Sequence, residues 1–439
     1  MSHDETHGGG AAVDPNRVNL NRVDLNRVDL SRVNLFDPRF HATGDPHRVW
    51  AAMRERAPLH RQELPDGRSF WSVTRYHDVC RVLGEHREFT SERGSLLHQL
   101  GTDDAASGLL LVATDPPRHT ELRRPLNRMF SAAGLAATRE RIRAAVRGIL
   151  TPALDGGEWD LAECAAKLPM AVAAQVMDIP EEFWPDLVAW SAMAASPEDP
   201  AHAVPHGSPL LVAHHGLFDY FSREFDRRSG TPGDDAIRLL MTMRGGELSR
   251  EEVVVNCYSV LLGANATTPH TVTGTLLALA ERPWIYRRAA AEPAAIPGLV
   301  EEGLRWSSAA SCFLRHAVRD VEIAGGLVPA GDPVAVWIGS ANRDATVFRD
   351  PDSFDPTRGD NRHLAFGFGP HYCLGATMAR ITLRIFFEEF LGFFGEVEPA
   401  GEPVRLASNF VSGHTRVPLR TRVRRSLAWH TGERIEAPC

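Results

Sequence analysis

Lysine is almost absent from this 439-residue sequence: Lys167 is the only one among 48 Lys and Arg residues. We attribute the arginine excess to GC-rich codon usage rather than to an arginine-rich binding surface. Acidic residues outnumber basic ones, 56 to 48, and the formal net charge is -8. Nucleic-acid-binding proteins usually carry a basic patch and a high isoelectric point. The composition therefore argues against a nucleic-acid partner.

Cysteine is also scarce, with six residues at positions 80, 164, 257, 312, 373 and 439. They are too few for a disulfide framework, and no two have the CxxC spacing of a zinc or thioredoxin-like site. No run of about 18 uncharged apolar residues occurs, and the N-terminal segment lacks the apolar core of a signal peptide. We therefore expect a soluble cytoplasmic protein without a membrane segment, in which any special cysteine is special for its chemistry.

The N-terminal region contains four pentads, NRVNL, NRVDL, NRVDL and SRVNL, over residues 16–35. A period of five matches neither the helix nor the strand period, so the repeat cannot keep one apolar face in either. Four short polar units are also too few for a solenoid. We interpret 1–35 as a disordered or extended N-terminal extension that could lie against the domain, with a partner-binding arm as the alternative. Residues 426–439 are interpreted as a C-terminal tail.

Helical periodicity dominates residues 36–425, which no Pro/Gly/Ser-rich linker divides. A capped helix is expected after Asp45, and a strand–turn–strand unit around Asp66-Gly67. Short β-strands are expected within 320–338 and 404–421. The fold class is therefore mainly α with small β-sheets, in one large domain. The other expected helices are 118–130, 136–153, 165–178, 209–228, 233–244, 250–280, 285–292 and 296–306.

The densest chemical signal is the run FGFGPHYCLG, which ends at Gly375 and contains Cys373. Glycines permit close backbone approach to a sulfur atom and expose N–H donors to it. A strongly helical run follows, so Cys373 lies near the positive end of a helix dipole, which stabilises a thiolate. A lone thiolate without a second cysteine or a carboxylate cluster suits the single axial bond to a haem iron. A buried structural cysteine is the alternative.

This run resembles the haem-binding signature of the cytochrome P450 superfamily, FxxGx(H/R)xCxG. The matching residues are Phe366, Gly369, His371, Cys373 and Gly375. The similarity spans roughly residues 36–419 and is that of the soluble bacterial branch. It implies a single-domain P450 fold in which haem b lies between a long distal helix and the helix after the cysteine loop. Cys373 would be the only protein ligand of the iron.

The resemblance also implies which residues bind the two haem propionates. His119 and Arg123 stand at i and i+4 of one predicted helix, and both match propionate contacts of the family. Arg315 and His371 match two further contacts. Together these four side chains offer the cations and donors that a buried dianion requires.

A second family motif is the ExxR pair formed by Glu302 and Arg305. Its i, i+3 spacing places the carboxylate and the guanidinium on one helix face. The family adds a third arm from a downstream arginine, which Arg358 in FDPTR supplies. The triad is predicted to be structural rather than catalytic, and the planar fork of arginine suits it better than lysine.

Residues 250–280 are predicted to form a single helix of roughly 45 Å, which resembles the long distal helix of the family. Ser249 and Glu252 provide a capping box at its start. In the family, the middle of this helix carries an acid followed by a threonine, and the two supply protons for oxygen activation.

Here the aligned run has Thr267 as the alcohol but Ala266 in the place of the acid. Thr267 is the predicted catalytic residue. Pro269 cannot donate to the Asn265 carbonyl, so the helix should kink or open there and leave a polar group facing the pocket. The Thr267 hydroxyl could instead bond back to the Gly263 carbonyl.

Substrate contacts are expected, by position in the family pattern, from residues 95–112 and from a mobile lid near 190–220. Histidines at 202, 206, 214 and 215 fall in or near this lid, and we interpret them as lid or surface residues rather than as a zinc site. Further expected pocket residues are Leu262, Gly263, Ala266, Ala310, Phe313, Phe410 and Val411.

The resemblance implies a haem-thiolate monooxygenase that uses O₂ and two electrons from an external ferredoxin and ferredoxin reductase. Its substrate would be a small organic molecule, free or carrier-bound, in secondary-metabolite biosynthesis. We expect Arg124, Arg128 and Arg380 to offer positive charge to an acidic ferredoxin.

Two alternatives use the same fold, an oxidative C–C or C–O coupling enzyme and a peroxygenase. Fatty-acid peroxygenases place an arginine in the distal helix, and none lies between Gly263 and Leu279. A non-catalytic haem sensor would need a signalling or DNA-binding module, for which the sequence leaves no room.

Overall fold

The computed structural model describes residues 25–102 and 105–424. The glycine-rich start, the first pentads and the predicted tail at 426–439 lie outside the described residues. The helices of the described part are α1 (Pro38–Thr43), α2 (Pro46–Arg56), α3 (Tyr76–Gly84), α4 (Arg118–Met129), α5 (Arg139–Leu150), α6 (Leu161–Met177), α7 (Trp184–Ala195), α8 (Pro209–Arg228), α9 (Ala236–Thr242), α10 (Arg250–Asn265), α11 (Thr268–Ala280), α12 (Pro283–Ala291), α13 (Ile296–Ser307), α14 (Ile338–Ala341) and α15 (Ala376–Phe393).

The strands are short and form small sheets. A five-stranded sheet has the order β1-β2-β8-β5-β3, and a three-stranded sheet the order β4-β12-β9. Two hairpins, β6-β7 and β10-β11, complete the set in the described residues. The strands are β1 (Leu59–Glu63), β2 (Ser69–Val73), β3 (Phe89–Thr90), β4 (Gly157–Asp160), β5 (Cys312–Ala317), β6 (Val321–Ile323), β7 (Gly326–Val328), β8 (Pro333–Trp337), β9 (Phe394–Pro399), β10 (Val404–Arg405), β11 (His414–Arg416) and β12 (Pro418–Val423).

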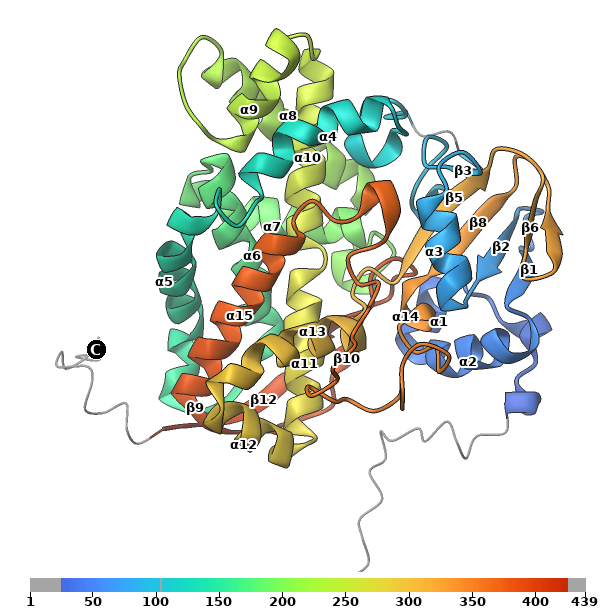
Figure 1. Ribbon diagram of the computed structural model, residues 1–439. Helices are drawn as coiled ribbons and strands as arrows, with labels where there is room; N and C mark the ends of the chain where they lie inside the picture. The colour runs from blue at the N-terminus through green and yellow to red at the C-terminus, as the bar shows by residue number, and fades with distance from the viewer. Residues whose placement is uncertain (1–24, 103–104, 425–439) are drawn as a thin grey trace, which may run out of the picture.

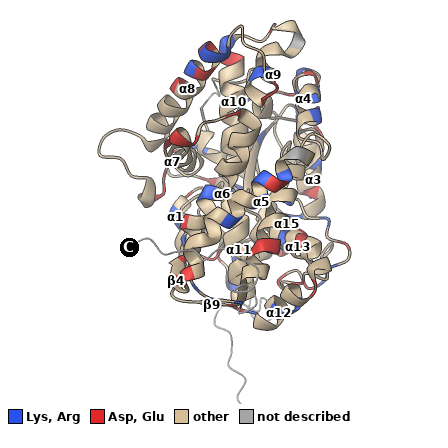
Figure 2. Ribbon diagram, turned by 90° about the vertical axis from the view of Figure 1, so that its left-hand side faces the viewer, with Lys and Arg blue, Asp and Glu red and all other residues tan. Residues whose placement is uncertain are grey.

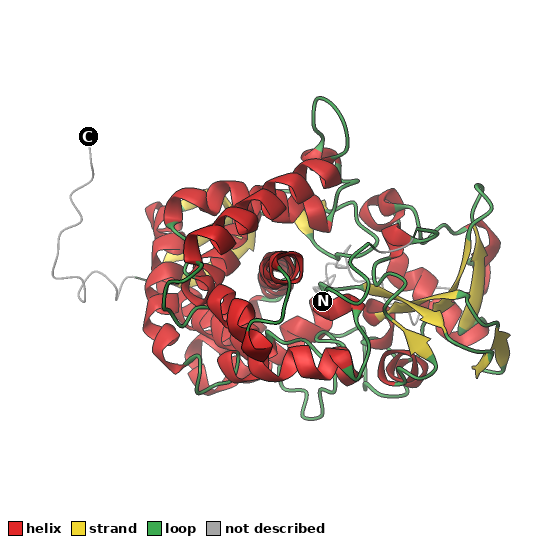
Figure 3. Cartoon of the chain, turned by 90° about the horizontal axis from the view of Figure 1, so that it is seen from above, coloured by secondary structure: helices red, strands yellow, loops and turns green. Residues whose placement is uncertain are grey.

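The helices form the larger part of the molecule, and most strands gather at one side (Figure 1). Seen from above, α10 is viewed end-on inside a ring of other helices (Figure 3). It packs against α6, α7, α8 and α9, whereas α11 packs against α6 and α13. The prediction of a mainly α fold with small sheets is confirmed, as is the hairpin at Asp66-Gly67, where β1 and β2 pair antiparallel and Gly67 has a φ of +85°.

The predicted single helix over 250–280 is wrong, because the structure has two helices, α10 and α11, separated at Ala266 and Thr267. The capping box at the start is present: Ser249 Oγ accepts from Glu252 N–H at 3.1 Å. The break follows from Pro269, which lacks an N–H but fits the first turn of a new helix. The sequence predicted an opening there, and the structure makes it a full interruption.

Residues 25–35 lie against the domain rather than apart from it. Two 3-10 turns, Leu25–Arg27 and Leu30–Arg32, repeat with the pentad. Leu35 is fully buried, so the packed domain begins before residue 36. The Gln62 side chain holds this segment: its Oε1 accepts from Leu35 N–H at 3.2 Å, and its Nε2 donates to the Val33 carbonyl at 2.8 Å.

Candidate functional site

A cavity of about 320 Å³ is lined by α10, α11, the cysteine loop and the start of α15. Its size falls within the range of roughly 300–1,000 Å³ typical of small-molecule sites. Residues of α4, α6 and β5 complete the wall. The predicted site residues that the structure brings to this cavity are His119, Arg123, Leu262, Gly263, Ala266, Thr267, Ala310, Phe313, Arg315, His371, Cys373 and Phe410.

The cysteine loop is a tight turn held by its own backbone. Cys373 N–H donates to the Phe366 carbonyl at 2.8 Å. Gly367 and Gly369 have φ values of +72° and +71°, in the left-handed region that favours glycine. A Cβ at Gly369 would lie 2.7 Å from the Cα of Gly84 in α3. Glycine at this position therefore lets the loop contact α3.

The Cys373 side chain is exposed to the cavity, whereas the other described cysteines are buried or half-buried. Burial deep in the protein raises the pKa of the Cys373 thiol. The Gly375 N–H and the guanidinium groups of Arg123 and Arg380 oppose this shift and lower the pKa. A backbone donor and positive charge are what a metal-bound thiolate requires.

Two imidazole rings lie together on another part of the cavity wall. The ring centroids of His119 and His371 are 4.4 Å apart, and His371 Nε2 lies 3.2 Å from Ser91 Oγ. Burial lowers the pKa of His119 to about 4 and also lowers the pKa of His371. His119 is buried, yet neither ring nitrogen has a hydrogen-bond partner among the described residues.

Two arginines accompany these histidines. Arg315 on β5 is buried and donates to the Leu314 carbonyl at 2.7 Å. Burial lowers the pKa of Arg315 to about 10. Arg123 on α4 lines the cavity and also braces the cysteine loop, because it donates to the Pro370 carbonyl at 3.2 Å and to the Tyr372 carbonyl.

Thr267 lines the cavity at the break between α10 and α11. No hydrogen bond joins its hydroxyl to the Gly263 carbonyl in this described part of the chain, so the expected back-bond is not formed. At this opening the polar residues Thr267 and Thr268 line the cavity, whereas Asn265 does not. Its Nδ2 donates to the Leu261 carbonyl at 3.2 Å and to Ser191 Oγ on α7 at 3.5 Å.

Ala266, which replaces the acid, packs in a small apolar cluster. The residue is buried against Ala195, Leu406 and Val411, with Phe410 at the edge. A carboxylate at this position would enter an apolar neighbourhood without a hydrogen-bond donor from the cluster.

Comparison with known proteins identifies the family. The family model "Cytochrome P450" matches residues 219–413. Cytochrome P450 NovI from Streptomyces niveus is 34% identical over 395 residues, which cover 88% of this chain and 96% of NovI. Cyclomarin C epoxidase CymV from Salinispora arenicola is 34% identical, covering 82% and 91%. The crystal structure of P450 OxyD, involved in the biosynthesis of vancomycin-type antibiotics, aligns with a TM-score of 0.82 at 32% identity, covering 89% of this chain and 100% of OxyD.

This chain belongs to the cytochrome P450 family. Its cofactor is therefore haem b, and the enzyme is a monooxygenase. The cavity fits this group, because it offers one exposed thiol and mainly apolar walls. The partnerless nitrogens of buried His119 and the nearly unpaired guanidinium of Arg315 are the donors that haem propionates would satisfy.

The chemistry of this P450 divides between the cofactor and the chain. When bound, haem with a thiolate ligand supplies electron transfer to dioxygen and favours O–O cleavage. Cys373 would provide the thiolate, with the Gly375 N–H directed at its sulfur. His119, Arg123, Arg315 and His371 would hold the propionates. Thr267 lines the same cavity, at the break between α10 and α11.

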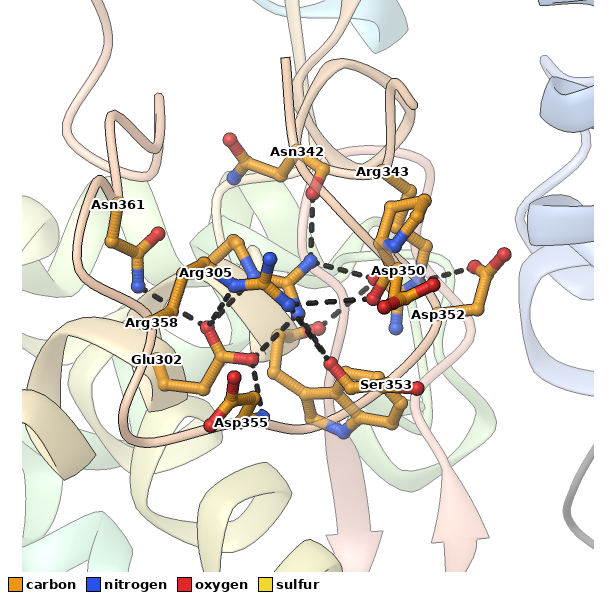
Figure 4. A network of polar contacts seen from close by, with 12 residues as sticks. Glu302, Arg305, Asn342, Arg343, Asp350, Asp352, Ser353, Asp355, Arg358 and Asn361 are labelled. Carbon is orange, nitrogen blue, oxygen red and sulfur yellow. Dashed lines mark hydrogen bonds and ion pairs between the residues drawn. The ribbon is translucent and has the colours of Figure 1, made fainter. Parts of the chain in front are cut away.

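The ExxR residues of the P450 lie outside the cavity in a buried polar network (Figure 4). Arg305 donates to both Glu302 carboxylate oxygens, at 2.8 and 2.7 Å, and both side chains are fully buried. Arg358 Nε and Asn361 Nδ2 approach the same carboxylate at 3.3 and 3.2 Å. Arg305 further donates to three backbone carbonyls, those of Asn342, Pro351 and Ser353. The geometry is that of a lock between α13 and the loop that precedes the cysteine loop.

Some expected pocket residues do not reach the cavity. Val411 is 1% exposed and pairs with Ala310 through a β-bridge, so it supports the wall from behind. No residue between 190 and 220 lines the cavity, and this part of the chain is fully described. The α6 side of the wall was missed because an alanine-rich apolar helix cannot be distinguished from core by sequence. Its lining residues are Pro169, Val172, Ala173, Val176 and Met177.

Two of the lid histidines contact other groups of the protein. His202 Nδ1 lies 2.8 Å from the Ser196 carbonyl, and His214 Nε2 lies 3.1 Å from the Tyr258 hydroxyl. Among the described residues, no three His, Cys, Asp or Glu side chains are grouped to hold a metal ion. Nor does any described helix have the length and apolar character to span a membrane.

Proposed function

We propose that this P450 oxidises a small organic intermediate of natural-product biosynthesis, with electrons from an external ferredoxin and its reductase. The observation that carries the proposal is a single cavity that joins the Cys373 thiol and the Thr267 hydroxyl through a mainly apolar wall. Two relatives favour the biosynthetic role: CymV is named as an epoxidase of cyclomarin C, and OxyD is involved in antibiotic biosynthesis.

The cavity wall favours reductase-supplied electrons over peroxide chemistry with a fatty acid. The arginines of the described wall are Arg123 and Arg315, and its histidines are His119 and His371; the four come from α4, β5 and the cysteine loop. None comes from α10 or α11. A substrate carboxylate therefore has no cation beside Thr267 to hold it.

The ferredoxin is proposed to dock near Arg124 and Arg128 on α4, which are both exposed. Arg380 is less available, because it makes two bonds to Glu301, at 2.7 and 2.8 Å, and lies over the Phe366 ring. Acidic and basic positions are interspersed over the side of the molecule in Figure 2, so docking would depend on a few arginines rather than on a broad field.

Reversing both charges, in Arg124→Glu/Arg128→Glu, is expected to slow reduction by ferredoxin and to remove most of its salt dependence, because steering between opposite charges is lost. Stopped-flow reduction measures both effects. Reduction by dithionite, which needs no docking surface, should be unchanged. If ferredoxin reduces the variant and the parent at equal rates, α4 is not part of the docking surface.

The substrate class can be tested by a binding screen followed by turnover. Amino acids, aromatic acids and macrolactones are titrated, each acid as the free form and as its pantetheine thioester, and displacement of the iron-bound water is followed as a Soret shift. Compounds that bind are then incubated with NADPH, ferredoxin and reductase under ¹⁸O₂. The proposal expects a product with one ¹⁸O atom. A dehydrogenated or coupled product without ¹⁸O would favour the coupling alternative.

Thr267→Ala is expected to retain haem and substrate binding but to divert electrons into hydrogen peroxide. With alanine at position 266, the Thr267 hydroxyl is the alcohol in the register of the family motif. General acid–base groups contribute about 10²–10⁴-fold to rates. Peroxide formed per NADPH consumed is the measurement, and Thr268→Ala, on the neighbouring wall residue, is the matched control. If both variants couple as well as the parent, proton delivery belongs to water or substrate.

Ala266→Asp, which restores the usual acid, is expected to lower the free energy of unfolding by ~1–3 kcal/mol, because the carboxyl group would be buried in an apolar cluster. Chemical denaturation measures the loss, with Ala266→Ser as the smaller polar control. We also expect slower turnover of the identified substrate. An equally stable Ala266→Asp protein with faster turnover would show that the cluster does not exclude the acid.

A further inference from the structure

We infer that Asn256, on α10, is a specificity-determining positioning residue that clamps residues 108–112 as one wall of the cavity. The inference rests on the proposed function only in taking this cavity as the substrate site. Leu111 and Val112 of the clamped segment line the cavity, and so does Asn256. Neither the distal threonine nor the haem-binding residues take part in the clamp.

The Asn256 side chain uses both ends of its amide on the backbone. Its Oδ1 accepts from Leu111 N–H at 2.9 Å, and its Nδ2 donates to the Leu109 carbonyl at 2.8 Å. Nδ2 also donates to the Glu252 carbonyl, one turn earlier in α10, at 2.7 Å. The residue is only 3% exposed, so these bonds replace water. Both N–H groups of the amide are therefore used, and its oxygen holds the wall segment.

A side chain of α4 binds the same segment. Arg118 Nε donates to the Gly108 carbonyl at 2.8 Å, and Arg118 also pairs with Glu252. Glu252 is in turn held by the capping box at the start of α10. Helix α4 thus holds the carbonyl of residue 108, and α10 holds the carbonyl of residue 109 and the N–H of residue 111.

The clamped segment is a closed loop that should move as a unit. Gly108 N–H donates to the Ala113 carbonyl at 2.9 Å, and Gly108 has a φ of +72°. Within the loop, Leu111 is nearly buried, whereas Val112 is 41% exposed although it lines the cavity. The exposed face of Val112 is available to a ligand, and its position depends on the backbone bonds of Leu109 and Leu111.

Only an amide satisfies this arrangement. Leucine in place of Asn256 has a similar shape but leaves the Leu109 carbonyl and the Leu111 N–H without partners, and buried unpaired backbone groups are costly. Aspartate retains an acceptor for Leu111 N–H but directs a carboxylate at two carbonyl oxygens. Both substitutions should therefore release the wall while the haem-binding residues stay in place.

The test compares azoles that share an iron-binding nitrogen but differ in reach. Imidazole, 4-phenylimidazole and clotrimazole are titrated into the holoenzyme by Soret difference spectra, for the parent, Asn256→Leu and Asn256→Asp. In both variants, we expect the dissociation constant of imidazole to change by less than about threefold. The ratio of the imidazole and clotrimazole dissociation constants should change by about tenfold or more, which corresponds to ~1.4 kcal/mol. Hydrogen exchange at Leu111 and Val112 should become faster in both variants.

Gln62→Leu is the matched control, since Gln62 is another buried amide that holds backbone groups but lies away from the cavity. It should lower stability without changing the azole ratio or the exchange of 109–112. An unchanged ratio together with unchanged exchange in the Asn256 variants would overturn the clamp. If no azole shifts the Soret band of the parent, the haem site itself is wrong, and exchange at 109–112 still decides the clamp.

Discussion

Arg305→Lys is expected to give a poorly soluble, haem-poor protein rather than a folded enzyme with low turnover. Arg305 makes two bonds to Glu302 and three to the backbone of the loop over 342–353, and it is completely buried. Lysine keeps the charge but has one nitrogen and no planar fork. Breaking a buried ion pair costs ~3–5 kcal/mol, against a total stability of about 5–15 kcal/mol.

Soluble yield, haem per chain and the melting temperature measure this effect. Arg384→Lys serves as the matched control, because Arg384 is exposed and its i, i+4 pair with half-buried Glu388 is worth at most ~0.5 kcal/mol. A stable, haem-replete Arg305→Lys protein with only its turnover reduced would contradict the structural role of the triad.

Cys373→Ala is expected to abolish the long-wavelength Soret band that thiolate ligation gives to the reduced, carbon monoxide-bound protein. Cys373 is the one described cysteine that is exposed to the cavity. Alanine provides no ligand, so monooxygenase turnover should fall below detection. The reduced carbon monoxide difference spectrum and haem content are the measurements.

Cys312→Ala is the control for this experiment. Cys312 precedes the cavity residue Phe313 on β5, but its thiol is buried. Burial raises the pKa of this thiol well above the ordinary value of a cysteine. The band should persist in Cys312→Ala. Its persistence in Cys373→Ala would require another ligand and would end the haem-thiolate assignment.

The sequence was most informative where local pattern and motif coincide. The glycines, the cysteine and the following apolar periodicity together predicted a loop and helix, because each feature depends on neighbours in the chain. The ExxR spacing likewise predicted a pair on one helix face, and the structure brings Glu302, Arg305 and Arg358 together. The helices 209–228 and 296–306 were predicted within a residue for the same reason.

Features that depend on distant contacts could not be predicted from the sequence. Arg380 pairs with Glu301 on α13, so its guanidinium is less available to a partner than a fully exposed arginine. The apolar cluster around Ala266 joins α7, the break after α10 and residues 406–411, so the surroundings of this position appear only in the fold. Asn256 gave no signal, because an asparagine in a helix reveals nothing of the loop that it binds 145 residues earlier.

Cys373 is expected to be the sulfur ligand of a haem iron in this cavity. X-ray absorption at the iron edge of the purified holoenzyme tests it directly, because sulfur scatters differently from nitrogen and oxygen. We expect one sulfur atom among the nearest neighbours of the iron in the parent protein and in Cys312→Ala, and none in Cys373→Ala. A parent spectrum with only nitrogen and oxygen neighbours, or a sulfur neighbour that survives in Cys373→Ala, would contradict it.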